Sequence, residues 1–160
     1  GFIKVQSKPD NGTTFTVMLP RTWREAEKTG PADRQQDGQG GQERVLLVED
    51  DAMVLVLAKR LLARSGYEVF EFEDSNEALA WFAEHPDQVD LVLTDVVMPG
   101  LNGPQLVEAV LEIRADLPYL YMSGYHREEQ VMNNDAEAEV LRKPFDAAAL
   151  LSAVRRSLKV

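Results

Sequence analysis

The sequence lacks cysteine and long apolar runs, and both absences narrow the chemistry of the chain. Because none of its 160 residues is cysteine, disulfides, thiolate metal ligands and thiol nucleophiles are excluded. No apolar run approaches the roughly 18 residues that span a bilayer, and the first residues, GFIKVQSKPD, do not follow the order of a signal peptide. We therefore expect a cytoplasmic protein with no membrane contact by this segment.

Basic side chains are outnumbered in this sequence. There are 17 Lys and Arg against 27 Asp and Glu, which gives a net charge of −10. Residues 1–43 hold six of each sign, so the whole acidic excess follows them. An acidic domain repels phosphate backbones, and we expect no direct nucleic-acid binding. The negative charge is suited instead to attracting cations or basic surfaces of partner proteins.

Large apolar side chains are missing from residues 30–42, GPADRQQDGQGGQ. Such a segment cannot contribute to a core, and it predicts a flexible linker, which we place at residues 23–43. Before it, FIKVQS and TFTVML alternate as strands do, and the DNG between them suits a hairpin. Two strands alone are marginally stable in water, so residues 1–22 are predicted to belong to something larger.

From residue 44 onward, short apolar runs alternate with segments of helical periodicity. The predicted strands are RVLLVE, YEVFEF, LVLTD, LPYLYMS and AEVLR. Five helices are predicted. The first covers Ala52–Arg64, the second begins at Asp74 or Ser75, and the third runs through Leu106 to Ile113. The fourth lies near 126–135 and the fifth begins at Asp146. This alternation predicts an α/β fold in which helices cover both faces of a parallel sheet.

Polar side chains stand at the carboxyl ends of four of these strands. Glu49 and Asp50 follow the first strand, Asp95 ends the third, Ser123 ends the fourth and Lys143 follows the fifth. Sites in open parallel sheets gather at this edge. Because Mg²⁺ prefers oxygen ligands and keeps several waters, one or two carboxylates and a carbonyl are enough to bind it. We therefore predict a divalent-metal site with Asp50 and Asp95 as direct ligands.

Four blocks, VLLVEDD, LVLTDVVMPGLNG, YMSGY and LRKPF, closely resemble in order and spacing the signature blocks of response-regulator receiver domains. The resemblance covers nearly all of residues 44–160. It implies a flavodoxin-like, doubly wound five-stranded parallel sheet of order 2-1-3-4-5 with five helices. It also implies that Asp95 accepts a phosphoryl group from phosphohistidine, with Mg²⁺ or Mn²⁺ as cofactor and a histidine kinase or histidine phosphotransfer protein as partner.

The same resemblance implies roles for individual residues. The metal is expected on Glu49, Asp50, Asp95 and the backbone carbonyl of Val97, with Glu49 acting through a metal-bound water. Lys143 is expected to pair with Asp95 before phosphorylation and with a phosphoryl oxygen afterwards. The peptide bond that follows this lysine is usually cis in the family.

Two further positions bear on signalling. Ser123 is expected to bond the phosphoryl group through its hydroxyl, at a position where the family most often has threonine. Three residues before Lys143 the family often has an aromatic ring that responds to phosphorylation, but this sequence has Val140. The aromatic ring that usually responds to phosphorylation is therefore missing at this position, and Tyr125 is our candidate to take over its role.

The first residues, GFIKVQSKPDNGTTFTVMLP, resemble the last two strands of a histidine-kinase ATP-binding domain, where the pattern GGxIxVxSxxGxGTxFxxxLP is common. The resemblance implies that residues 1–22 are a remnant of such a domain, in a hybrid sensor kinase that carries its receiver at the C-terminus. The parts that hold nucleotide are missing from this sequence. We therefore expect no ATP binding by this chain.

Two other functional classes fit parts of the sequence. A phosphatase that forms an aspartyl-phosphate needs a second acidic residue two positions after its nucleophile. This sequence has Val97 at that position, which argues against this class. A docking domain that is never phosphorylated would tolerate Val140, but every side chain that phosphorylation needs is present. A receiver that catalyses its own phosphorylation and dephosphorylation, as a switch or a relay, is the leading hypothesis.

Overall fold

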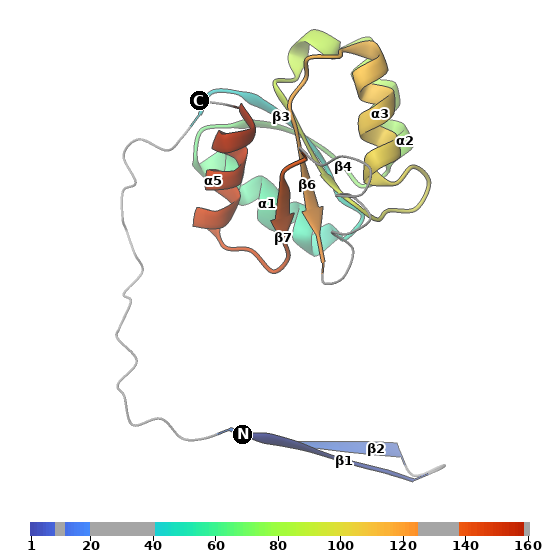
Figure 1. Ribbon diagram of the computed structural model, residues 1–160, viewed down its shortest axis with the longest axis vertical. Coiled ribbons are helices and arrows are strands. Elements are labelled where there is room, and N and C mark those ends of the chain that lie inside the picture. Colours follow the sequence, from blue (N-terminus) through green and yellow to red (C-terminus); the bar gives the residue numbers. More distant parts are fainter. Residues whose placement is uncertain (9–11, 20–40, 125–137, 159–160) are drawn as a thin grey trace. The chain divides into compact units, whose positions relative to one another are not determined.

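The computed structural model of the chain describes residues 1–8, 12–19, 41–124 and 138–158. Its residues form two compact units that divide between Gln35 and Gln36 (Figure 1). The first unit contains an antiparallel hairpin of β1 (Phe2–Lys8) and β2 (Gly12–Met18), as the sequence predicts.

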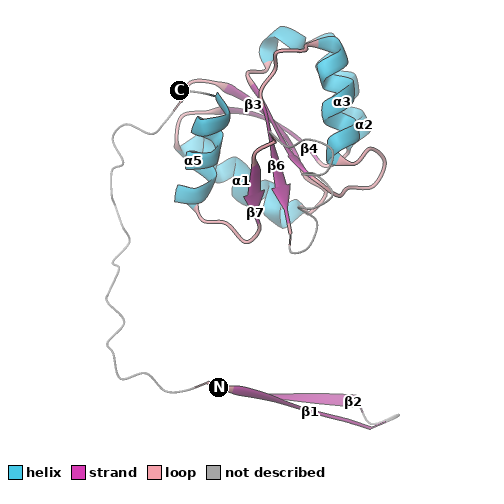
Figure 2. Cartoon of the chain, in the orientation of Figure 1, coloured by secondary structure: helices cyan, strands magenta, loops and turns pink. Residues whose placement is uncertain are grey.

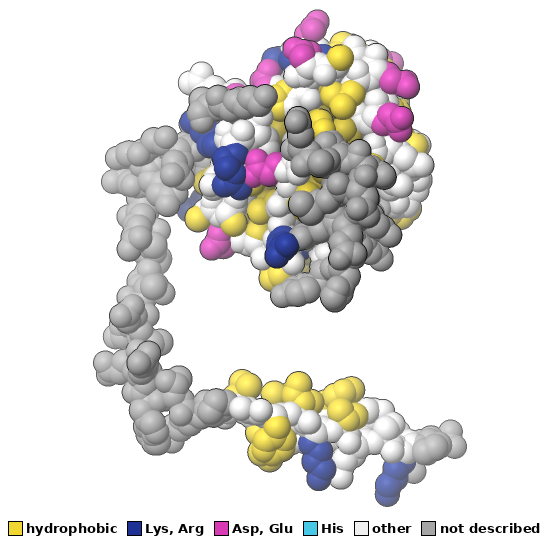
Figure 3. Space-filling view, in the orientation of Figure 1, with side chains coloured by type: hydrophobic (Ala, Val, Ile, Leu, Met, Phe, Trp, Pro, Cys, Tyr) yellow, Lys and Arg dark blue, Asp and Glu magenta, His cyan; other side chains and the backbone are white. Residues whose placement is uncertain are grey.

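The hairpin has one apolar face. Its register pairs Ile3 with Val17 and Val5 with Phe15, and alternation along each strand places these four side chains on the same side. Figure 3 shows hydrophobic side chains along one side of the hairpin, and the lysines together with a further hydrophobic group on the other. Ile3 and Phe15 are each 67% exposed. Because a lone hairpin is marginally stable, this face is suited to packing against a further surface.

The second unit contains a five-stranded parallel sheet in the order β4-β3-β5-β6-β7. Its strands are β3 (Arg44–Val48), β4 (Glu68–Phe72), β5 (Leu91–Asp95), β6 (Tyr119–Ser123) and β7 (Val140–Arg142). This arrangement confirms the predicted order 2-1-3-4-5.

Four of the five predicted helices lie among the described residues. They are α1 (Ala52–Arg64), α2 (Ser75–Glu84), α3 (Gly103–Ile113) and α5 (Ala147–Leu158). The predicted helix near 126–135 lies outside the described residues. A short 3-10 turn, η1 (Pro86–Gln88), follows α2, and its proline occupies the first position, where no backbone donor is needed.

Local sequence signals explain where the helices begin. The Asp51 side chain accepts from two backbone N–H groups at the start of α1, and the Asp74 side chain does the same for α2. Asn102 and Gln105 form a capping box at the start of α3. Gly66, just past α1, has a φ of 93°, which favours glycine.

Helices cover both faces of the sheet (Figure 2), and the core has two layers, one on each face. The helices α1 and α5 pack on one face around a cluster that includes Leu47, Leu62, Leu93 and Leu150. The helices α2 and α3 pack on the other face around a second cluster. The central strand β5 is buried from Leu91 to Thr94, as its nearly continuous apolar run predicts. None of the helices in the described part of the chain has the length and hydropathy that a membrane span requires.

Candidate functional site

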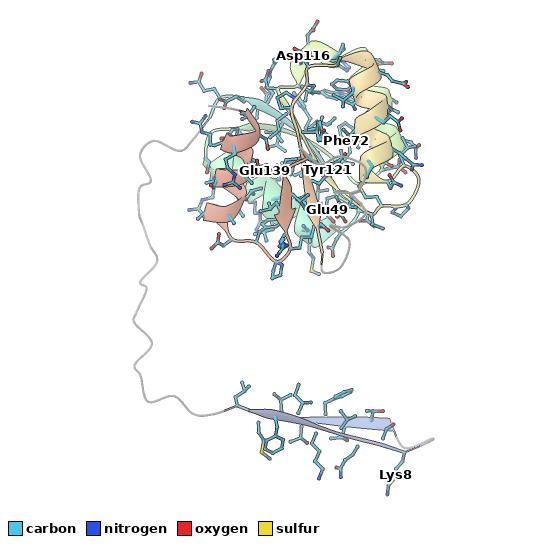
Figure 4. The ribbon with its side chains drawn as sticks, viewed as in Figure 1. Lys8, Glu49, Phe72, Asp116, Tyr121 and Glu139 are labelled. Carbon is cyan, nitrogen blue, oxygen red and sulfur yellow. The ribbon has the colours of Figure 1, made fainter. Side chains whose placement is uncertain are left out.

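The predicted site residues meet at one edge of the sheet. Glu49 directly follows β3, Asp95 ends β5, Ser123 ends β6 and Lys143 directly follows β7. These four strands are neighbours, and the sheet order reverses between β3 and β5, where sites in such sheets form. Figure 4 shows Glu49 and Asp116 toward opposite ends of the sheet.

Three carboxylates gather at this edge. Glu49, Asp50 and Asp95 each offer an oxygen, and these oxygens lie within 4.8 Å of one another. Two oxygens on one Mg²⁺ ion cannot be more than about 4.2 Å apart, because each Mg–O bond is about 2.1 Å long. The carboxylates thus need only small movements to share an ion, and hard oxygen donors are what Mg²⁺ and Mn²⁺ prefer. The donor set fits the predicted metal.

Lys143 is the cation of the cluster. Its Nζ lies 3.2 Å from Oδ2 of Asp95, in line with the predicted pairing, and 2.5 Å from Oε2 of Glu49, a contact the sequence did not indicate. Burial raises the pKa of Glu49, while the ammonium of Lys143 opposes this increase. The peptide bond between Lys143 and Pro144 is cis.

Backbone donors orient two of the carboxylates. The N–H of Val96 donates to Oδ1 of Asp95 at 2.8 Å, so the other oxygen, Oδ2, faces Lys143. The N–H of Asp51 donates to Oε1 of Glu49 at 3.3 Å. Both carboxylates are therefore held in place by the main chain next to them.

Ser123 is buried at the end of β6, with 1% of its surface exposed. Its hydroxyl donates to the carbonyl of Gly124 at 3.1 Å, while its own carbonyl accepts from the N–H of Lys143 at 2.7 Å. The second bond ties the end of β6 to the residue after β7. The hydroxyl has to leave its present acceptor before it can donate to another group.

Val97 lies two residues past Asp95 and is 38% exposed. The backbone beneath this loop is crowded, because the N–H of Gly103 donates to the carbonyl of Val96 at 3.0 Å. A Cβ at Gly103 would lie 2.3 Å from the carbonyl oxygen of Asp95. The start of α3 is thus pressed against the backbone of the candidate phosphoacceptor, a contact that sequence reasoning missed.

A buried tyrosine lies beside the position where the family often has an aromatic ring. Tyr121 on β6 is aligned with Val140 on β7 and is 3% exposed. It belongs to a small cluster with Val96 and Val107, so its ring packs near the residue that follows Asp95. Tyr125, our sequence candidate for this role, lies outside the described residues.

Comparisons with known proteins agree with this geometry. Residues 45–155 match the family described as "Response regulator receiver domain". The chain is 32% identical over 117 residues to the "Response regulator receiver protein CpdR" of Brucella abortus, covering 72% of this chain and 96% of that protein. The crystal structure of the receiver domain from the hybrid histidine kinase CckA is similar, with 33% identity and a TM-score of 0.61 over 72% of this chain and 98% of that chain.

The similarity to a further relative extends across both units. The "Sensor kinase CckA" of Brucella abortus is 34% identical over an alignment of 169 residues, gaps included, that covers 99% of this chain but 18% of the kinase. The chain therefore spans less than a fifth of that relative. A receiver domain protein from Clostridium thermocellum superposes with a TM-score of 0.68 and 28% identity over 73% of this chain and 94% of that chain.

Proposed function

This chain belongs to the response regulator receiver domain family, and from this we propose that Asp95 accepts a phosphoryl group from a phosphohistidine of a two-component partner. One observation carries the proposal. The Asp95 carboxylate lies within reach of both an acidic pair, Glu49 and Asp50, and the ammonium of Lys143. This setting suits phosphoryl transfer, in which positioning and charge compensation supply most of the catalysis.

The step is a transfer between two nucleophiles. An oxygen of the Asp95 carboxylate bonds to phosphorus, the bond from phosphorus to the histidine nitrogen breaks, and the imidazole leaves with its electron pair. Mg²⁺ or Mn²⁺, held by Asp50, Asp95 and the carbonyl of Val97, would neutralise charge on the phosphoryl oxygens. The flexible stem of Lys143 lets its ammonium pair with a phosphoryl oxygen after transfer, and the hydroxyl of Ser123 donates to another phosphoryl oxygen.

Acetyl phosphate tests this proposal without a protein donor. The chain is incubated with acetyl phosphate and Mg²⁺, and its intact mass is measured. We expect the mass to increase by one phosphoryl group in the presence of Mg²⁺ and to stay unchanged when the ion is chelated. An unchanged mass in both samples would favour the alternative of a docking domain that is never phosphorylated.

Metal affinity should distinguish the two acids that follow β3. We expect Asp50→Ala to weaken Mg²⁺ binding more than Glu49→Ala, because Asp50 is exposed and free to bind the ion directly, whereas Glu49 is 1% exposed and already bonded to Lys143. Calorimetric titration of the unphosphorylated protein measures both losses. Equal losses would count against this ranking.

We also propose that the chain is part of a cytoplasmic hybrid sensor histidine kinase. Its similarity to the sensor kinase CckA extends through the hairpin, and the exposed apolar face of the hairpin suits the packing surface of a larger domain. In this proposal residues 1–22 are the end of the ATP-binding domain, residues 23–43 are the linker and residues 44–160 are the receiver. Kinase activity would belong to the parts of such a protein that this sequence lacks.

Deleting residues 1–40 should hardly change the stability of the receiver. Residues 30–40 offer no large apolar side chain that could anchor the hairpin to the receiver, whereas the N–H of Gly41 donates to the carbonyl of Ser65 and Glu43 pairs with Arg155. We expect the free energy of unfolding in urea to change by less than about 1 kcal/mol. The matched deletion of residues 1–43 removes both contacts and should lose about 1 kcal/mol more. A large loss from the shorter deletion would contradict the prediction.

The partner is proposed to dock on α1. Three large apolar side chains on this helix are exposed, Met53 at 81%, Val56 at 44% and Leu57 at 47%, and their spacing places them on one face. The helix begins directly after Asp50 and Asp51, so a protein that brings a phosphohistidine to Asp95 can cover this face. Exposed apolar groups beside a reaction site favour a protein partner over a small donor.

Leu57→Glu should separate docking from chemistry. We expect transfer from a phosphorylated histidine phosphotransfer protein to slow about tenfold, because a charge replaces a buried interface contact, while the rate with acetyl phosphate falls less than twofold. Ile113→Glu is a matched control, since Ile113 on α3 is similarly exposed, at 45%. Equal effects of the two variants on the protein donor would contradict docking on α1.

A further inference from the structure

The shortest ionic contact of the site does not involve the candidate phosphoacceptor. Lys143 Nζ lies 2.5 Å from Glu49 and 3.2 Å from Asp95. The side chain of Glu49 is 1% exposed and that of Lys143 is 19% exposed, so the pair is largely shielded from water. The ammonium is shared between two carboxylates and lies closer to the buried one.

Both oxygens of Glu49 are engaged by the protein. One accepts from the N–H of Asp51 at 3.3 Å and the other accepts from Lys143. A buried carboxylate that loses its cation is left as an uncompensated charge, which is strongly unfavourable. Glu49 and Lys143 therefore depend on each other in the unphosphorylated protein.

We infer that Glu49 is a positioning residue for Lys143, which it holds beside Asp95 before a donor arrives. A lysine stem has many rotamers, so a fixed anion that orders its ammonium removes part of the entropic barrier to reaction. The inference rests on the proposed function of Asp95 and adds a role for Glu49 that does not pass through a metal-bound water.

The same contact has a consequence for metal binding. Lys143 is a cation that already lies within the acidic cluster of Glu49, Asp50 and Asp95. Its charge partly neutralises the carboxylates that would attract a divalent ion. Removing the ammonium with Lys143→Met should therefore raise the affinity for Mg²⁺ several-fold.

The ammonium itself provides a direct readout. In the unphosphorylated protein at low temperature, the ¹⁵N–¹H signal of the Lys143 ammonium should be visible, because a shielded ion pair slows its hydrogen exchange. We expect this signal to disappear in Glu49→Gln, which keeps the size of the side chain and an acceptor for Asp51. It should remain in Asp50→Asn, which removes the same charge from the same cluster. Retention of the signal in Glu49→Gln would overturn the inference.

A double-mutant cycle tests whether the pair acts as a unit. At saturating Mg²⁺, Glu49→Gln should slow phosphorylation by acetyl phosphate about tenfold in the native background. In the Lys143→Met background the same substitution should change the rate less than about twofold, because the residue it positions is gone. Equal losses in both backgrounds would show that Glu49 acts independently of Lys143, which overturns the inference.

The outcomes also separate this inference from the proposed function. If the native protein is never phosphorylated while the ammonium signal behaves as expected, the assignment of Asp95 fails and the pairing of Glu49 with Lys143 stands. If circular dichroism shows that Glu49→Gln does not fold, the inference is tested instead by measuring the affinity of Lys143→Met for Mg²⁺ by calorimetric titration. An affinity for Mg²⁺ that is unchanged or lower in that variant overturns the inference.

Discussion

Asp95→Asn is expected to abolish phosphorylation by acetyl phosphate. An amide oxygen carries no full negative charge and is a poor nucleophile toward phosphorus, so we expect the rate to fall by at least about a thousandfold. The amide retains an oxygen that can accept from the N–H of Val96, which donates to the Asp95 side chain in the native protein. The fall in the rate of phosphorylation should therefore reflect the loss of the carboxylate nucleophile rather than a displacement of the end of β5.

The matched control for this variant is Asp116→Asn. It makes the same change in charge and shape, but Asp116 is 84% exposed and lies toward the opposite end of the sheet (Figure 4). Intact mass after reaction with acetyl phosphate and Mg²⁺ should show one added phosphoryl group in the control and none in Asp95→Asn. An added phosphoryl group in Asp95→Asn would place the acceptor on another residue.

Local sequence patterns predict most of the fold because each element carries its own boundary signals. The helix predicted over Ala52–Arg64 has these limits in the structure, since Asp51 caps its start and Gly66 takes a positive φ just beyond its end. The buried strand β5 coincides with LVLTD for a similar reason, because its apolar run stops at a charged residue. Alternation of strands and helices then leaves few ways to arrange a parallel sheet.

The composition of the candidate site could also be predicted, but its internal contacts could not. The carboxyl ends of neighbouring parallel strands must lie at one edge, so strand-end residues such as Asp95 and Lys143 had to come together. Which carboxylate lies nearest to the ammonium depends on side-chain length and burial. Glu49 reaches Lys143 at 2.5 Å from a position with almost no exposure, and no local pattern reveals this.

Register and backbone contacts across the sheet are likewise hidden from local patterns. Tyr121 lies beside Val140 because of how β6 and β7 align, and a sequence pattern does not specify which residues of parallel strands are paired. The 3-10 turn at Pro86–Gln88 is a short connector without hydrophobic periodicity, so the sequence shows only its proline. Gly103 is a further case, since its role depends on the backbone of a different element.

Gly103→Ala is expected to destabilise the receiver strongly and to slow its phosphorylation. The new Cβ would lie 2.3 Å from the carbonyl oxygen of Asp95 and 3.1 Å from the Cα of Val96. Both are backbone atoms, so the start of α3 or the end of β5 has to move. Overpacking of this kind typically costs about 1–3 kcal/mol. A shift at Asp95 also displaces the reacting carboxylate from Lys143.

Two opposing effects make this prediction decisive. Alanine is favoured over glycine in a helix by about 1 kcal/mol, so if helix propensity dominated at Gly103, the first residue of α3, the variant would be more stable. Gly124→Ala is the control, because among the described residues no atom outside its chain neighbours lies within 4 Å of an added Cβ, and its stability should change by less than about 0.5 kcal/mol. Urea unfolding and the rate with acetyl phosphate measure the two effects separately. A stable, normally phosphorylated Gly103→Ala protein would show that α3 is not pressed against Asp95, because a tight backbone contact cannot accept a methyl group without moving.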